Sequence, residues 1–197
     1  MGRRQRILEA VAAFGACLTL AFTPATALAA TGNPLPPAAV NNPDIPLSVI
    51  TSLPEVIQND REIIIADDFD PASPIIYPDG SPVEGQSARK TAAAARCGGT
   101  ASAGVLGTWG VPSVGGCAIF GSPGHQEVYS WHVMDPTKTV CVQGKGFSAA
   151  GTQTWYGIGC GTSRTGVGVR WGNILANPAL RAMSQAYLLG NSVSWHR

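Results

Sequence analysis

The chain has little charge, and its second half has almost no acidic side chains. Charged residues make up 13% of the 197 residues, and after Cys97 the only carboxylates are Glu127 and Asp135. Hydrolysis of a glycosidic bond by paired carboxylates needs two acids at one site. In an extended strand the eight residue steps between these two acids span roughly 26 Å. The sequence therefore argues against that chemistry.

Histidine is equally scarce, since His125, His132 and His196 are the only three. A strand would place His125 and Glu127 on one face, because side chains two residues apart share a face. A zinc site needs three or four protein ligands. No third ligand stands at a suitable spacing, so we expect no metal and no cofactor. The G-x-S-x-G motif of serine hydrolases is also missing, and Gly146–Gly151 departs from it by one residue.

No apolar run reaches the length of about 20 residues that a membrane-spanning helix needs. The run Val11–Phe22 follows a basic stretch at residues 3–6 and precedes the small-residue pattern at residues 27–29. That order is typical of a secretory signal peptide, so residues 1–29 are predicted to be removed by cleavage after Ala29. The protein is then expected to be secreted and extracellular, without stable insertion in a membrane.

Acidic and basic residues are concentrated in different parts of the rest of the chain. Residues 30–96 contain nine acidic and four basic side chains, a net charge of −5. Residues 97–197 contain two acidic and six basic side chains, a net charge of +4. The basic half has no dense Lys and Arg cluster, so we expect no nucleic-acid partner. Ten prolines in residues 30–96 hinder both helix and sheet, and this acidic segment is predicted to be largely disordered.

Two interpretations of the acidic segment remain open. The first is a flexible linker or stalk, since polar proline-rich segments are usually disordered. The second is a propeptide that lies on the basic half and is released by cleavage near Arg89 or Arg96. In support of the second, the apolar run Ile63–Ile65 beside Asp67 could add a strand to a sheet edge.

The cysteines predict two disulfides. Five cysteines are present, and the predicted signal peptide takes Cys17 with it. An even number in an exported protein indicates disulfides. A hairpin centred between Ala150 and Gly151 places residue 141 opposite residue 160, where the side chains are close enough to bridge. We therefore predict the pairs Cys141–Cys160 and Cys97–Cys117.

Residues 97–197 are predicted to form an all-β domain, a small disulfide-stapled antiparallel β-sandwich. Short β-prone runs alternate with Gly and Pro turns, as is typical of a sandwich or barrel. The predicted strands are 104–111, 116–121, 126–134, 138–146, 153–160, 166–171 and 192–196. Residues 178–189 are ambiguous, because Asn177 and Gly190 suit the ends of a helix while Met183 and Tyr187 share a face in either structure. We predict a short helix there, with an additional strand as the alternative.

Aromatic side chains are the main resource for function in this half, which contains all five tryptophans. An exposed Trp or Tyr beside an Arg can stack on sugars or on a protein partner. The tripeptide Ser-Trp-His occurs at 130–132 and at 194–196, where two neighbouring strands could carry equivalent side chains. The candidate ligand-binding residues are Trp131, Trp155, Tyr156, Arg170 and Trp171.

Three functions follow in order of preference. The first is a secreted, non-catalytic extracellular binding module that uses exposed aromatics. Its partner would be a cell-wall or other polysaccharide, or an extracellular protein. The alternative is a secreted antimicrobial or enzyme-inhibitor protein that an acidic propeptide masks until cleavage. An enzyme comes third, and it would need His132, Asp135 and Glu127 gathered in one cleft.

Overall fold

Strands dominate the structure, and most of them belong to one large sheet. The computed structural model describes residues 34–93, 97–186 and 190–197, and residues 34–197 form one compact unit. The helices are α1 (Pro37–Asn41), α2 (Leu47–Thr51), α3 (Glu55–Gln58) and α4 (Ala88–Ala93). The strands are β1 (Ile64–Ile65), β2 (Ile75–Ile76), β3 (Gly98–Gly104), β4 (Ser113–Val114), β5 (Ala118–Phe120), β6 (Gln126–Val133), β7 (Val140–Phe147), β8 (Gln153–Gly161), β9 (Ser163–Arg170), β10 (Ile174–Ala176), β11 (Ala179–Ser184) and β12 (Ser192–His196). Within the described residues, no helix is both long and apolar enough to cross a membrane.

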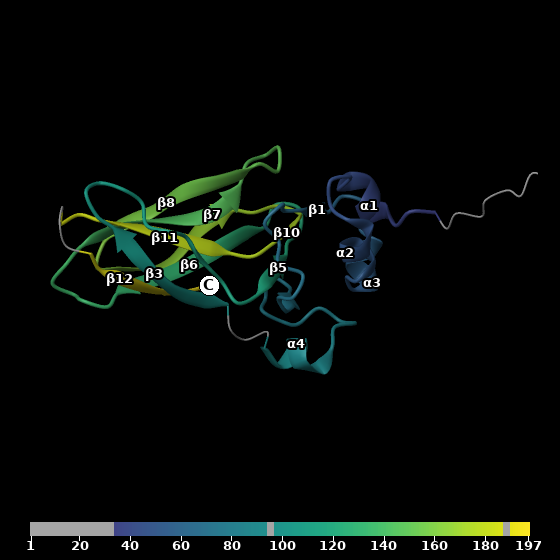
Figure 1. Cartoon of the computed structure of the whole chain (residues 1–197), viewed down its shortest axis with the longest axis horizontal. Coiled ribbons are helices and arrows are strands. Elements are labelled where there is room, and N and C mark those ends of the chain that lie inside the picture. Colours follow the sequence, from purple (N-terminus) through teal and green to yellow (C-terminus); the bar gives the residue numbers. More distant parts are fainter. Residues whose placement is uncertain (1–33, 94–96, 187–189) are drawn as a thin grey trace, which may run out of the picture. The chain divides into compact units, whose positions relative to one another are not determined.

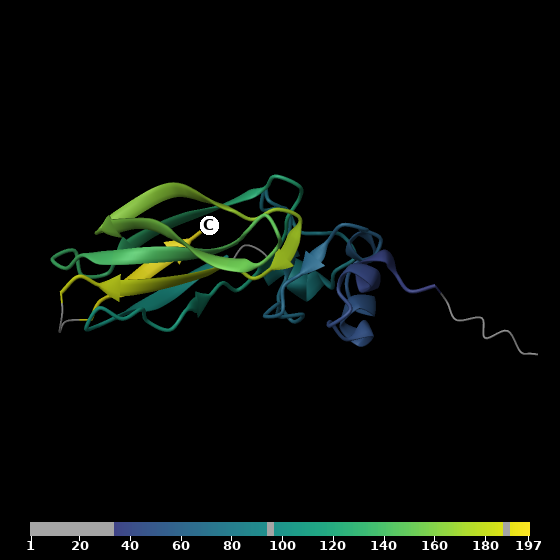
Figure 2. The same ribbon diagram turned by 90° about the horizontal axis from the view of Figure 1, so that it is seen from above.

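The large sheet nearly closes on itself. Its strands follow the order β8-β7-β11-β3-β12-β6-β9, and β4 pairs with β11. The first and last strands of this order, β8 and β9, are consecutive in the chain and lie against each other. Figure 1 and Figure 2 show the strands surrounding a common interior. The predicted mainly β fold is confirmed. The predicted sandwich of two sheets is confirmed only in part, because one sheet curls around the core.

Alternation along the strands separates an inner face from an outer face. On β6, Tyr129 and Trp131 are buried, whereas Val128 and His132 are exposed. Trp195 of β12 lies directly opposite Trp131 in the same core. The two Ser-Trp-His tripeptides therefore lie side by side on neighbouring strands, with both tryptophans inside and both histidines exposed.

The large sheet is mixed, which corrects the prediction of a purely antiparallel one. β11 runs parallel to β3, so that Ala182 pairs with Ala103. In the smaller sheet, β1 runs parallel to β10 and β2 parallel to β5. Parallel neighbours need a long connection between them, and an argument built from successive hairpins supplies only antiparallel pairs.

The helix predicted at residues 178–189 is wrong for the described part of that segment, which forms strand β11. Leu180 and Ala182 are buried in the core, whereas Arg181 and Met183 are partly exposed. This alternation has the period of a strand. β11 lies between β7 and β3, where backbone pairing on both sides outweighs the local helix signals. Residues 187–189 lie outside the described residues.

The strand predicted at 104–111 lies instead at Gly98–Gly104, as β3. A β-carbon at Gly98 would collide with the carbonyl oxygen of Trp195 on the neighbouring strand β12. Glycine thus permits a close approach of two backbones here, although glycine weakens the strand signal in a sequence. The other six predicted strands correspond to β5, β6, β7, β8, β9 and β12.

Both predicted disulfides are confirmed. Cys141 of β7 lies in register with Cys160 of β8, and their Cα atoms are 4.0 Å apart. Cys97 bridges Cys117, with Cα atoms 5.1 Å apart. Each bond closes a loop of about 20 residues, which in the chain-entropy description stabilises the fold by about 3 kcal/mol.

The acidic segment is ordered where it is described, which corrects the predicted disorder for residues 34–93. Pro36, Pro46 and Pro54 stand at the N-caps of α1, α2 and α3. A proline there costs no intrahelical hydrogen bond, because the first helical N–H groups have no partner within the helix. Ile50 and Ile57 of these helices are buried in a shared core. The prolines that suggested disorder therefore mark the starts of short helices.

A four-stranded sheet joins this segment to the rest of the chain, in the order β1-β10-β5-β2. The Ile64 N–H donates to the Asn173 carbonyl oxygen (3.1 Å), and the Ala66 N–H to that of Leu175 (3.0 Å). The predicted strand addition by Ile63–Ile65 is thus confirmed. Figure 1 shows β1, β5 and β10 at one end of the large sheet, next to α1, α2 and α3. Strands from both sides of residue 97 share one sheet and one hydrophobic core.

Candidate ligand-binding site

Two of the five predicted ligand-binding residues are buried, which corrects that part of the prediction. Trp131 and Trp171 expose 2% and 0% of their surface, so neither ring can stack on a ligand. Trp131 occupies the inner face of β6. Trp171 packs edge-to-face on Phe147, with ring centroids 5.1 Å apart, and its indole N–H donates to the Ile174 carbonyl oxygen (3.0 Å). In both cases packing in the core uses the aromatic surface.

Tyr156 and Arg170 do not belong to a common surface either. Tyr156 is half-buried against the core of the large sheet, and its hydroxyl donates to the Phe147 carbonyl oxygen (3.1 Å). Arg170 is exposed at the end of β9, opposite Gln126. It forms no cation–π contact or ion pair with the described residues. Of the predicted set, Trp155 alone is a partly exposed aromatic side chain in a cation–π contact.

Trp155 lies beside Trp109, Arg181 and Gln143, and we call these four residues the aromatic platform. The guanidinium carbon of Arg181 lies 4.6 Å from the centroid of the Trp155 ring and 5.1 Å from that of Trp109. Both distances fall within the roughly 6 Å typical of a cation–π contact. The Nε of Arg181 donates to Oε1 of Gln143 at 2.8 Å. One arginine therefore contacts two indoles while Gln143 holds its Nε.

Three strands and one loop position these side chains. Arg181 of β11 lies directly opposite Gln143 of β7, and β8 pairs with the other edge of β7. Arg181 points away from the core because its neighbour Ala182 points into it. The loop at residues 105–112 brings Trp109 back to the sheet, where the N–H of Gly110 donates to the Ala182 carbonyl oxygen (2.8 Å). The platform thus depends on pairings between segments far apart in the sequence.

No carboxylate of the described residues balances the charge of Arg181. Desolvation lowers the pKa of Arg181 from its ordinary value, but a guanidinium stays protonated in proteins. Glu127 pairs with Arg197 at 2.7 Å, and Asp135 pairs with Lys138 at 3.1 Å. These are the only two carboxylate side chains after Cys97, so the platform carries an unpaired positive charge.

The neighbouring cation on β7, Lys145, is paired instead. Its side chain is 1% exposed, and its Nζ donates to both carboxylate oxygens of Asp68, at 2.5 and 2.7 Å. Desolvation lowers the pKa of Lys145, and the hydrogen bonds and charge of Asp68 oppose that shift. A cavity of about 400 Å³ borders Asp68 and Phe147, and no platform residue lines it. The acidic segment thus neutralises Lys145 and leaves Arg181 free.

Glu127, His132 and Asp135, the residues that an enzyme would need in one cleft, have different surroundings. His125 lies just before β6 rather than within it, and its Nε2 lies 3.2 Å from Glu127 Oε2. The buried carboxylate of Glu127 also accepts from Nε of Arg197, which fixes it structurally. His132 is exposed on the outer face of β6. No three metal-binding side chains cluster anywhere in residues 34–93, 97–186 and 190–197.

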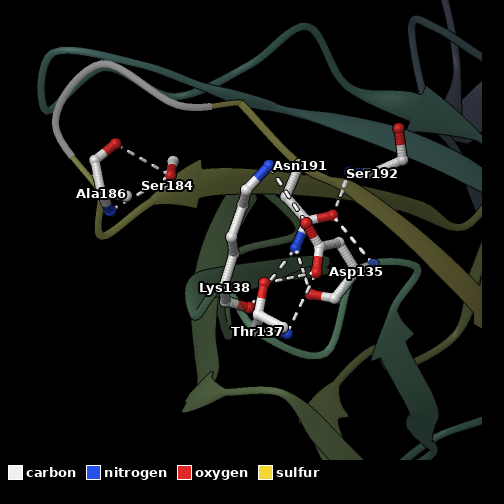
Figure 3. A network of polar contacts seen from close by, with 7 residues as sticks. All are labelled: Asp135, Thr137, Lys138, Ser184, Ala186, Asn191 and Ser192. Atoms are coloured by element: carbon white, nitrogen blue, oxygen red, sulfur yellow. Dashed lines mark hydrogen bonds and ion pairs between the residues drawn. The ribbon is translucent and has the colours of Figure 1, made fainter.

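Asp135 belongs to a separate network in the loop after β6, shown in Figure 3. Its Oδ1 accepts from the hydroxyl of Thr137 (2.6 Å), and Nδ2 of Asn191 donates to its carbonyl oxygen (3.1 Å). Hydrogen bonds from Thr137 and then Lys138 hold the pKa of Asp135 at about 2. The network ties the loop between β6 and β7 to the residues that begin β12, which is a structural role.

Sequence reasoning missed Trp109, Gln143 and Arg181. Trp109 lies in a segment predicted as a strand, and Arg181 lies in the predicted helix. The alternation of Leu180 and Arg181 would have placed Arg181 on an outer face if the strand alternative had been preferred. No local pattern indicates that the loop carrying Trp109 returns to the sheet.

The platform has the chemistry of a binding surface, with two aromatic rings, one guanidinium and one amide. No protein family, curated protein or solved structure matches this chain.

Proposed function

We propose that this protein is a secreted, non-catalytic binding protein that holds polysaccharide on the aromatic platform. The observation that carries the proposal is the stack of Arg181 against Trp109 and Trp155. Both indoles are partly exposed. Sugar rings combine apolar C–H faces with hydroxyl groups, and an indole beside fixed polar groups suits both parts. The two disulfides are compatible with an extracellular protein.

The rigidity of the platform supports binding. Arg181 is held by Gln143 on one side and contacts both indoles, and all four residues are anchored to a nearly closed network of strands. Binding costs free energy whenever mobile side chains must be ordered. A surface whose side chains are already held in place avoids most of that cost.

The alternative, an antimicrobial or inhibitor masked by a removable propeptide, has less support. β1 and β2 of the acidic segment pair with β10 and β5. Ile65 and Ile75 pack against Leu175 in one core. Removal of the residues before Cys97 would expose this core, whereas a mask should leave the released protein intact. The segment therefore behaves as part of the fold.

The proposal is tested by retention of the secreted protein on insoluble polysaccharides such as cellulose, chitin and bacterial cell wall. An aromatic contact contributes about 0.5–1.5 kcal/mol, so Trp155→Ala and Trp109→Ala should each weaken binding by roughly 2- to 12-fold. His132→Ala, which removes an exposed ring outside the platform, is the matched control and should bind like wild type. Full retention of both tryptophan variants, or no retention of wild type on any glycan, would refute the proposal.

A further inference from the structure

Only one of the three guanidinium nitrogens of Arg181 forms a hydrogen bond with the described residues. Its Nε donates to Gln143, while its two terminal nitrogens form no hydrogen bond or ion pair with the described residues. The five N–H groups of a guanidinium lie in one plane and form a fork that matches a carboxylate with two parallel hydrogen bonds. The terminal edge of this fork is therefore available to a ligand.

The two indoles lie against this fork. They contact the guanidinium at 4.6 and 5.1 Å, and stacking on aromatic faces is a property of arginine that lysine does not share. Partial desolvation by the rings strengthens charge interactions in this place. A planar carboxylate can bind the fork in the same plane and remain beside the rings. A tetrahedral sulfate or phosphate projects out of that plane.

The electrostatic surroundings also favour an anion. The platform lies in the half of the chain with a net charge of +4. The nearest cation along β7, Lys145, is already paired with Asp68, and both acidic side chains after Cys97 are engaged elsewhere. Nothing within the described residues competes with a ligand for the charge of Arg181.

We infer that the polysaccharide bound by the platform is acidic, with a uronic-acid carboxylate on the terminal nitrogens of Arg181 and the sugar ring against Trp109 or Trp155. This inference rests on the proposed function and specifies its ligand class. Gln143, which is held by the same arginine, is positioned to contact a neighbouring hydroxyl group.

The test compares three soluble polymers by isothermal titration calorimetry with the full secreted chain. They are polygalacturonate, the same polymer with its carboxylates methyl-esterified, and dextran sulfate. Wild type should bind polygalacturonate at least about tenfold more tightly than its methyl ester, since hydrogen bonds to charged groups are the strong ones. It should bind dextran sulfate no more tightly than polygalacturonate. Arg181→Gln should remove this preference. Arg170→Gln, which removes the same charge at an exposed site, should change affinity by less than about twofold.

Arg181→Lys separates directed recognition from general charge attraction. Lysine keeps the charge but loses the planar fork and the stacking, so the affinity of this variant for polygalacturonate should fall by at least about fivefold. Near-ultraviolet circular dichroism checks that the variants fold. If Arg181→Gln is unstable, competition by free galacturonate against polygalacturonate on wild type replaces it, and competition is expected.

The outcomes distinguish failure of the acidic-ligand inference from failure of the proposed function. Equal binding of the acidic polymer and its methyl ester, still lost in Trp155→Ala, would overturn the acidic ligand and leave the platform as a site for neutral glycan. Stronger binding of dextran sulfate, or an affinity of Arg181→Lys equal to that of wild type, would overturn carboxylate recognition. Binding that Trp155→Ala and Trp109→Ala leave unchanged would overturn the proposed function itself.

Discussion

The ion pair between Lys145 and Asp68 predicts a one-sided effect of mutation. The Lys145 side chain is 1% exposed, whereas that of Asp68 is 51% exposed. Removal of the carboxylate leaves a buried cation without a partner, which is costly. Removal of the amine leaves a carboxylate that water can solvate. Asp68→Asn should therefore destabilise the fold far more than Lys145→Met.

The magnitude of this effect can be bounded. Breaking a buried ion pair typically costs about 3–5 kcal/mol. The lysine can instead lose its proton, which at pH 7 costs at most about 4.6 kcal/mol from an ordinary pKa of about 10.4. Water reaches Asp68 and screens the ion pair, so the free-energy cost of breaking this pair should lie at or below the low end of that range. We expect a loss of about 2–3 kcal/mol for Asp68→Asn and less than about 1 kcal/mol for Lys145→Met, where methionine fills the same space.

The stability difference should also depend on pH. Desolvation lowers the pKa of Lys145 and Asp68 opposes this shift, so the pKa of Lys145 should fall further in Asp68→Asn. Between the folded and unfolded pKa values the unfolded chain binds more protons, and the free energy of unfolding then rises with pH. The deficit of Asp68→Asn should shrink as the pH rises towards the ordinary lysine pKa of about 10.4, by at most about 1.4 kcal/mol per pH unit.

Urea unfolding followed by tryptophan fluorescence, with the disulfides intact, measures these free energies at several pH values. The double variant Asp68→Asn/Lys145→Met completes a thermodynamic cycle and should be close to Lys145→Met alone. Equal losses for the two single variants would refute the reasoning. A loss for Asp68→Asn below about 0.5 kcal/mol, or one that does not change with pH, would refute it as well.

Three further predictions concern structural features. The pKa of Asp135, about 2 because of hydrogen bonds from Thr137 and Lys138, should rise towards 3.8 in Thr137→Val; carboxyl NMR titration measures it, and an unchanged value would contradict the assignment. Because this pKa is lowered in the folded state, its stabilisation is complete above the ordinary pKa and is lost as the pH falls towards 2. Removal of the Cys141–Cys160 bond by a double Ala substitution should cost about 3 kcal/mol in urea unfolding, and unchanged stability would show that the bond constrains little. Gly98→Ala should lose about 2–4 kcal/mol, because its methyl group would meet the Trp195 carbonyl oxygen; unchanged stability would contradict that close approach.

Local signals were sufficient for the features that depend on neighbouring residues. The turn at residues 148–151 joins β7 and β8 into one hairpin, and a one-residue register shift between Val142 and Gln143 brings Cys141 opposite Cys160. The second pair then follows because only Cys97 and Cys117 remain. The short apolar run at Ile63–Ile65 likewise indicated an edge strand, and that strand is present as β1.

Long-range pairing decided the features that local signals predicted wrongly. The helix signals around Ala179–Ser184 are real, but this segment lies between β7 and β3 and pairs with both. The prolines of residues 34–93 indicated disorder because their role as helix caps becomes visible only when the helices pack on a core. Propensity is a weak signal that such tertiary contacts override.

The aromatic platform likewise combines features that the sequence indicates with features that depend on tertiary structure. A strand pattern indicates which side chains share a face, but it does not indicate which face is the core. Trp131 and Trp155 therefore looked equivalent in sequence, although one is buried and the other is partly exposed. The disulfide pairing, the mainly β character and most strand positions were determined by the sequence alone, because each depends on short-range geometry. The near-closure of the sheet, the incorporation of the acidic segment and the meeting of Trp109, Trp155 and Arg181 were decided only by the tertiary structure, because they depend on how distant strands pair.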